Sequence, residues 1–236
     1  MGGKSLKGWI CMDSNITAVL LAGGKGERLR PFDGPKCLLP VCGKPLMEYT
    51  LEHISKFVNR INIAVGYKSD LVGRYLVGKI IDDRLFGLWN WGISDEGENA
   101  SMIHRLKAAS HPGLNLVCYA DEYAPVDIPQ LLTFHKSKRL PITVSTVSLK
   151  LDVGVFHAGS FVEKPLLRQY KVNIGYMLMD QEVIDQIGNY DSLAPVLFEY
   201  YDKEEIALYK HLGDRWTINT LRDLEEVERA MSDHRS

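Results

Sequence analysis

The chain has 236 residues, a length that corresponds to one or two domains of ordinary size. Its 28 Lys and Arg residues and 30 Asp and Glu residues give a formal net charge of −2. This balance argues against a generic polyanion binder, because such proteins carry a basic excess. The 45% of hydrophobic and 25% of charged residues are typical of a globular protein and not of a disordered one.

Membrane and secretion signals are absent from the sequence. No apolar run approaches the roughly 20 residues of a membrane helix, and no apolar segment of signal-peptide length follows the first lysines. The four cysteines, Cys11, Cys37, Cys42 and Cys118, form no CxxC pair and have no zinc-site spacing. We therefore predict free thiols in a soluble, cytoplasmic protein.

Taken in chain order, the sequence begins with residues 1–15, which we expect to form a loose N-terminal leader. No Pro-, Gly- or Ser-rich linker divides the remainder, so residues 16–236 are predicted to form a single domain. Apolar runs and β-branched residues predict five strands, at 16–22, 61–65, 115–120, 142–149 and 173–179.

Helical periodicity marks three further segments. Met47, Leu51, Ile54 and Val58 recur at helical spacing, and residues 180–187 form a second short helix. A last helix begins after the N-cap residue Thr220. The alternation of strands and helices predicts an α/β fold with a mostly parallel sheet.

A glycine-rich loop follows the first strand directly. Its glycines are Gly23, Gly24 and Gly26, which let the backbone turn tightly and approach a ligand. The N–H groups of such a loop form an anion cradle. Three cations follow nearby: Arg28, Arg30 and Lys36. Phosphate is the natural ligand for this combination of backbone donors and positive charge.

Two common phosphate-binding motifs do not fit this chain. The dinucleotide fingerprint needs a third glycine or an alanine where Leu29 stands. The nearest match to a Walker A loop, at residues 73–79, has Ile80 where a magnesium-binding hydroxyl is required, and no strand precedes it. Both motifs are therefore rejected.

Six short segments, considered together, resemble one known family. They are the glycine loop at 21–31, Pro35-Lys36, the stretch 43–49, Phe161-Val-Glu-Lys-Pro165, Asn173-Ile-Gly-Tyr176, and the residues 216–224. Their types and order are similar to those of the sugar-1-phosphate nucleotidyltransferases. The resemblance implies a three-layer, Rossmann-like core of the GT-A type. It also implies transfer of a nucleotidyl group from an NTP to a sugar 1-phosphate, giving an NDP-sugar and pyrophosphate for nucleotide-sugar biosynthesis.

The resemblance also implies roles for individual residues. Arg28 and Lys36 would be catalytic. The nucleotide would contact Leu21, Ala22, Gly23, Gly24, Gly26, Gly97 and Asn99. The sugar phosphate would contact Glu163, Lys164, Asn173 and Gly175. The attacking phosphate oxygen is already an anion at neutral pH, so the reaction needs no general base, only groups that position two anions and stabilise the leaving pyrophosphate.

A magnesium site is expected at Asp121, which follows the strand 115–120 at the edge where ligands of open α/β sheets bind. The resemblance implies a second metal-binding Asp three residues before Thr220, but Thr217 stands there. Asp214 and Asn219 are nearby substitutes, but neither is aligned with the expected position, so the sequence departs from the family pattern here. The number of metal ions is thus left open.

Two other functions remain as alternatives. One is a cytidylyltransferase for a non-sugar phosphate, against which the Glu163-Lys164-Pro165 motif argues. The other is a nucleotide-binding regulatory subunit that has lost catalysis, which Thr217 favours. The expected partners are an NTP and a sugar 1-phosphate, with neither nucleic acid nor membrane. The base, the sugar and homo-oligomerisation are left open.

Overall fold

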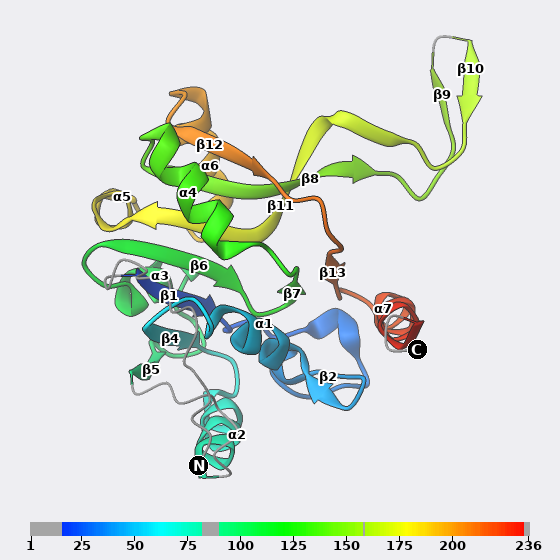
Figure 1. The fold of residues 1–236 in the computed structure, drawn as a ribbon. Helices are drawn as coiled ribbons and strands as arrows, with labels where there is room; N and C mark the ends of the chain where they lie inside the picture. Colours follow the sequence, from blue (N-terminus) through cyan, green and yellow to red (C-terminus); the bar gives the residue numbers. More distant parts are fainter. Residues whose placement is uncertain (1–15, 82–89, 158, 234–236) are drawn as a thin grey trace, which may run out of the picture.

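The computed structural model describes residues 16–81, 90–157 and 159–233, so the predicted leader, residues 1–15, lies outside the described residues. A seven-stranded sheet forms the centre of the molecule (Figure 1). Its strands, in order across the sheet, are β12 (Ile206–Lys210), β8 (Ile142–Lys150), β11 (Leu166–Asp180), β6 (Leu114–Tyr119), β1 (Ile16–Leu21), β4 (Arg60–Val65) and β5 (Trp91–Asp95).

Strand direction confirms the mostly parallel sheet. β11 is antiparallel to both of its neighbours, β6 and β8, and every other adjacent pair in this sheet is parallel. β1 lies between β4 and β6, with Val19 opposite both Asn62 and Val117. The five residues Ile16 to Leu20 are therefore buried, as the continuous apolar run predicts for a strand covered on both faces.

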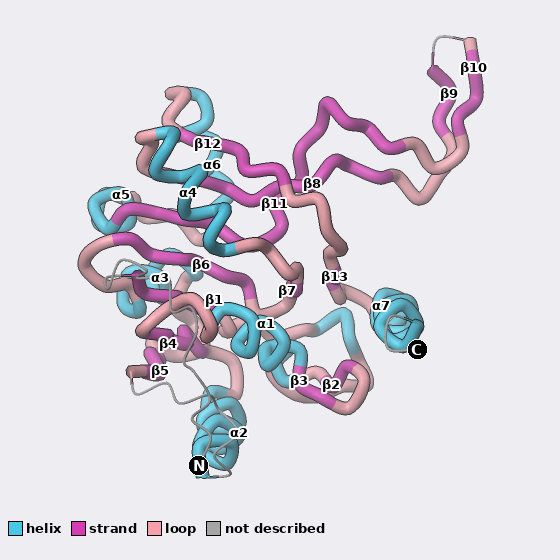
Figure 2. The backbone as a smooth tube through the Cα atoms, viewed as in Figure 1, coloured by secondary structure: helices cyan, strands magenta, loops and turns pink. Residues whose placement is uncertain are grey.

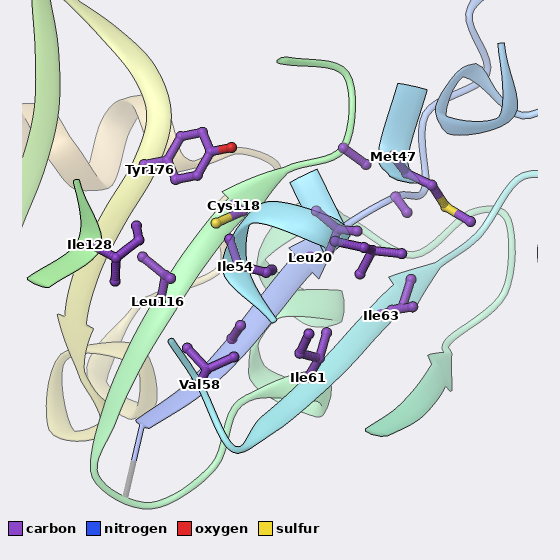
Figure 3. Close-up of a cluster of buried hydrophobic side chains, with 14 of the residues drawn as sticks. Leu20, Met47, Ile54, Val58, Ile61, Ile63, Leu116, Cys118, Ile128 and Tyr176 are labelled. Atoms are coloured by element: carbon purple, nitrogen blue, oxygen red, sulfur yellow. The ribbon is translucent and has the colours of Figure 1, made fainter. Parts of the chain in front are cut away.

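Helices cover both faces of the sheet, which confirms the three-layer α/β fold. One face carries α1 (Leu46–Ile54), α2 (Ser69–Ile81) and α4 (Ile128–Lys138). The other carries α3 (Met102–Ala109), α5 (Gln181–Gln186) and α6 (Leu193–Asp202). Leu20 of β1 packs in the first layer and Val19 in the second, because successive strand residues point to opposite faces. Figure 3 shows the cluster of buried side chains in the first layer, which includes Leu20, Met47 and Ile63.

A smaller cluster lies beside the main sheet and holds the C-terminal helix. It joins α7 (Leu221–Asp233) to the ribbon of β2 (Pro40–Val41) and β3 (Lys44–Pro45), through apolar contacts that include Val41, Leu46 and Val227. A second ribbon pairs β7 (Glu122–Tyr123) with β13 (Trp216–Thr217). This ribbon brings the chain after β12 back beside the end of β6.

A two-stranded arm projects away from the layered body. It consists of β9 (Val155–His157) and β10 (Ser160–Val162), paired antiparallel beyond the ends of β8 and β11 (Figures 1 and 2). Phe156 and Phe161 lie against each other on this arm, with 85% and 55% of their surfaces exposed.

The five predicted strands and the helices at 180–187 and after Thr220 are confirmed, most of them to within one residue at each end. The strand predicted at 173–179 is longer than expected, because β11 begins at Leu166. Helix α1 ends at Ile54, before Val58. Four helices that the periodicity did not reveal, α2, α3, α4 and α6, are also present. Cys37, Cys42 and Cys118 are free thiols, as predicted. None of the helices in the described part of the chain is long and apolar enough to cross a membrane.

Candidate active site

The glycine loop runs from the end of β1 into two short 3-10 helices, η1 (Glu27–Leu29) and η2 (Lys36–Leu38). Gly26 starts η1 in a left-handed conformation, with φ of 68°. A Cβ on Gly26 would lie only 3.1 Å from Cβ of Lys36. Gly26 is therefore required both by its backbone and by the close approach of Lys36.

Lys36 is the centre of a group of polar side chains. Its side chain is almost buried, and its Nζ donates to Oδ2 of Asp121 at 2.7 Å and to Oδ1 of Asn219 at 2.9 Å. Nη2 of Arg28 donates to the same Oδ1 of Asn219, at 3.3 Å. The structure thus brings together Arg28, Lys36 and Asp121, three of the residues selected from the sequence.

Tertiary structure explains how Asn219 reaches this group. Asp121 follows the carboxyl end of β6. The pairing of β7 with β13 places the segment after Thr217, which contains Asn219, beside Asp121. Tyr123 and Trp216 stack across this ribbon, with ring centroids 5.4 Å apart and nearly parallel planes. Oδ2 of Asp223 accepts hydrogen bonds from the backbone N–H groups of Asn219 and Thr220, both at 2.8 Å, and so orients the loop.

The charge state of Asp223 suits this role. Burial opposes ionisation of the carboxyl, but hydrogen bonds from Asn219 and Thr220, together with the nearby charge of Lys36, hold its pKa below the usual range. The carboxylate therefore stays ionised and keeps accepting from the loop at neutral pH.

Of the residues near the expected second acid, the structure brings Asn219 to the Lys36 group. Thr217 pairs with Glu122 within the β7–β13 ribbon, and its hydroxyl oxygen is buried. The carbonyl oxygen of Asp214 is bonded to Nε2 of His211. Of the two nearby candidates, Asn219 is the one whose side-chain oxygen accepts a hydrogen bond from Lys36.

Two pockets meet at Lys36 and Asp121, which line both of them. The first has a volume of about 340 Å³, and the predicted nucleotide-binding residues along it are Leu21, Ala22, Gly23 and Gly24. The second, of about 550 Å³, is lined by the predicted residues Gly26 and Arg28 and by Asn219. The two hollows therefore form one continuous concave surface around the ammonium group of Lys36.

The predicted base-binding segment lies next to this surface. Gly97 adopts a positive φ of 82° and is exposed, as is Asn99, and neither lines the two pockets. Arg105 of α3 does line the first pocket, and its Nη2 donates to the carbonyl of Gly97. Sequence reasoning missed Arg105, since no periodicity or motif marked it.

The predicted sugar-phosphate residues fall in two separate places. Gly175 lies against Tyr119 and Glu122, which line the first pocket, and its N–H donates to Oδ1 of Asn173 at 2.9 Å. Glu163 and Lys164 are exposed and directly follow β10, and neither lines the two pockets. The structure does not bring these two residues to Lys36.

Glu122 is a further carboxyl at the site that the sequence did not select. Its Oε1 accepts from Nη2 of Arg215 at 3.2 Å, and its Oε2 is buried without a hydrogen-bond partner among the described residues. Burial raises the pKa of Glu122, although the charge of Arg215 opposes the rise. Burial likewise raises the pKa of the neighbouring Tyr119 phenol to about 12.

Comparison with known proteins assigns the family. The model of the MobA-like NTP transferase domain matches residues 18–147, more than half of the chain, so the chain belongs to this family. A glucose-1-phosphate cytidylyltransferase of Salmonella typhimurium is 27% identical over 248 aligned residues, covering 90% of this chain and 95% of the relative. A mannose-1-phosphate guanylyltransferase of Mycobacterium tuberculosis is 28% identical over 73% of this chain and 51% of its own length.

A solved structure supports the same assignment at the level of the fold. UDP-glucose pyrophosphorylase in complex with UDP-glucose superposes with a TM-score of 0.69 at 17% identity, covering 92% of this chain and 98% of the other. The relatives are thus sugar-1-phosphate nucleotidyltransferases, and the resemblance and the GT-A type of fold are both confirmed.

Proposed function

We propose that this protein transfers a nucleotidyl group from an NTP to a sugar 1-phosphate, forming an NDP-sugar for nucleotide-sugar biosynthesis in the cytoplasm. The observation that carries the proposal is the convergence of Arg28, Lys36 and Asp121 beneath the glycine loop, where two pockets meet. Each pocket can hold one part of the substrates, and the Lys36 ammonium lies where they join. The named activities of the relatives agree with this chemistry.

The reaction proceeds in line at the α-phosphorus. An oxygen of the sugar phosphate attacks this atom, a new P–O bond forms, and the bond to the bridging oxygen of the β-phosphate breaks with release of pyrophosphate. Lys36 holds the α-phosphate, and Arg28 stabilises the charge that develops on the pyrophosphate. The backbone of the glycine loop positions the triphosphate without any change in protonation.

We further propose that Mg²⁺ acts here with Asp121. The oxygens of Asp121 and Asn219 both lie within hydrogen-bond distance of Lys36 Nζ, so these two hard donors are close together and could both face an ion held beside the ammonium group. No cluster of three His, Cys, Asp or Glu side chains suited to a metal occurs in the described residues. Phosphate oxygens would therefore complete the coordination, as Mg²⁺ usually requires, and the ion would neutralise phosphate charge.

Pyrophosphate release over a grid of nucleotides and acceptors tests the function. CTP, GTP, UTP and dTTP are each combined with several sugar 1-phosphates and with a non-sugar phosphate such as an amino-alcohol phosphate. We expect release with at least one sugar 1-phosphate, dependent on Mg²⁺ and abolished by EDTA. Pyrophosphate release with the non-sugar phosphate alone would contradict the proposal and indicate a cytidylyltransferase for a non-sugar phosphate.

Nucleotide-binding measurements distinguish the proposed enzyme from a regulatory subunit that has lost catalysis. Nucleotide binding without release at any point of the grid would indicate a regulatory subunit. The Asn219→Asp variant tests the metal proposal, because an added carboxylate should lower the Mg²⁺ concentration that gives half-maximal activity. Unchanged Mg²⁺ dependence in this variant, or full activity in EDTA, would contradict the placement of the metal.

A further inference from the structure

Arg105 occupies an unusual place at the first pocket. Its guanidinium lies directly over the Cα atoms of two glycines that follow neighbouring strands. A Cβ on Gly23 would lie 2.5 Å from Nη1 of Arg105, and a Cβ on Gly66 would lie 2.4 Å from its Nη2. A side chain at either position would displace the guanidinium from this place, so the two glycines leave the space that it now occupies.

The guanidinium is held in place from one side. Nη2 donates to the carbonyl oxygens of Gly97 and Glu98, at 3.0 and 2.9 Å. Nε is buried and has no hydrogen-bond partner within the described residues. A cation whose donors are only partly satisfied, fixed by two backbone carbonyls at the wall of a pocket, is suited to bind acceptor atoms of a ligand.

The position of Arg105 points to the base of the nucleotide. Arg105 lines the first pocket together with Leu21, Ala22 and Gly23, and it does not line the second pocket, where Arg28 lies. Since the reacting phosphate is placed at Lys36 and the pyrophosphate at Arg28, the nucleoside must extend into the first pocket. This assignment rests on the function proposed above.

We propose that Arg105 determines which bases the protein accepts, by donating to two adjacent acceptor atoms of the base. A guanidinium is only a donor, so it pairs well with O2 and N3 of cytosine or with O6 and N7 of guanine. Uracil and thymine place the N3–H donor between their carbonyls, and adenine places an amino group beside its ring acceptors. The protein therefore favours CTP or GTP over UTP, dTTP and ATP.

Equilibrium binding tests this proposal without any catalytic step. Dissociation constants for CTP, GTP, UTP, dTTP and ATP are measured by calorimetry in EDTA. We expect CTP or GTP to bind roughly 10- to 100-fold more tightly than the other three, and the comparison of these two nucleotides identifies the base. Arg105→Gln should reduce the preference to about threefold or less. Arg74→Gln, at an exposed arginine of α2, is the matched control and should keep the preference.

Nucleotide analogues make the test independent of how the variant folds. The unmodified protein should bind 3-deaza-CTP, or 7-deaza-GTP if GTP is preferred, at least about 10-fold more weakly than the parent nucleotide, because one acceptor is missing. Equal binding of the analogue would overturn the proposal. A folded Arg105→Gln variant that keeps the original base preference would also overturn the proposal. The same holds if the variant binds all five nucleotides more weakly by the same factor. Absence of pyrophosphate release would instead count against the proposed function, so the two failures are distinguishable.

Discussion

At the scale of single residues, Lys36 connects most of the site. It is almost buried, yet its ammonium group reaches both Asp121 and Asn219, and Asn219 in turn accepts from Arg28. Two oxygens thus hold the cation at the junction of the pockets before any substrate is bound. Phosphate groups that enter would meet a positive charge whose position is already set, which is how preorganised sites stabilise transition states.

Replacement of Lys36 or Arg28 by alanine should therefore lower kcat by at least roughly a hundredfold, the effect of losing one transition-state donor. Steady-state pyrophosphate release measures the effect. Lys203→Ala provides the control, because Lys203 pairs with Glu199 at the surface of α6 and should leave kcat unchanged. Turnover near that of the unmodified protein in either site variant would contradict the catalytic assignment.

At the scale of elements, the start of α7 serves both stability and the site. Thr220 Oγ1 accepts from the N–H of Asp223 at 3.2 Å, and the Asp223 carboxylate accepts from Thr220 N–H, a reciprocal cap like the capping box. The same carboxylate accepts from Asn219 N–H. One side chain therefore links the helix start to the residue that contacts Lys36.

Two substitutions separate the contribution of this helix start to stability from its contribution to the position of Asn219. Thr220→Ala should lower the free energy of unfolding by about 1 kcal/mol, as loss of a cap does, with little change in kcat. Asp223→Ala should cost a similar amount of stability and also lower kcat, because the Asn219 backbone loses its acceptor. Urea unfolding and pyrophosphate release measure the two quantities. Equal effects of both substitutions on kcat would argue against a positioning role for Asp223.

At the scale of the whole molecule, two histidines lie in the helical layer formed by α1 and α4, with His135 buried and His53 half-buried. His53 donates from Nε2 to the carbonyl of Val126 at 2.7 Å, and His135 bonds through Nδ1 to the hydroxyl of Thr143 at 2.8 Å. Burial lowers the pKa of both imidazoles below their usual value. The unfolded chain therefore takes up protons at a higher pH than the folded protein does.

Stability should consequently depend on pH in the weakly acidic range. The contribution of each neutral histidine is complete above about pH 6.5 and is lost as pH falls through the lowered pKa. The free energy of unfolding should thus decline between about pH 7 and 5, by at most about 1.4 kcal/mol per pH unit for each histidine. Urea denaturation across this range measures the slope, and the double variant His53→Gln and His135→Gln should flatten it. An unchanged slope in the double variant would assign the dependence to other groups.

Local patterns in the sequence determined much of this protein. The apolar run of β1, the glycine loop with Arg28 and Lys36, and the cap at Thr220 each depend on residues close together in the chain. Backbone conformation and strand burial follow from such neighbours, so the α/β fold and the places of the glycine loop and Asp121 at the ends of β1 and β6 could be predicted.

Only the tertiary structure decided which residues from distant parts of the chain lie beside the glycine loop and Lys36. Asn219 reaches Lys36 across 183 positions because β13 pairs with β7, and no local pattern encodes that pairing. Arg105 meets Gly23 because β1 and β4 are neighbours beneath α3, whereas Glu163 follows β10 and lines neither of the pockets at Lys36. Contacts of this kind depend on the order of strands in the sheet and on packing between layers, which are properties of the folded chain as a whole.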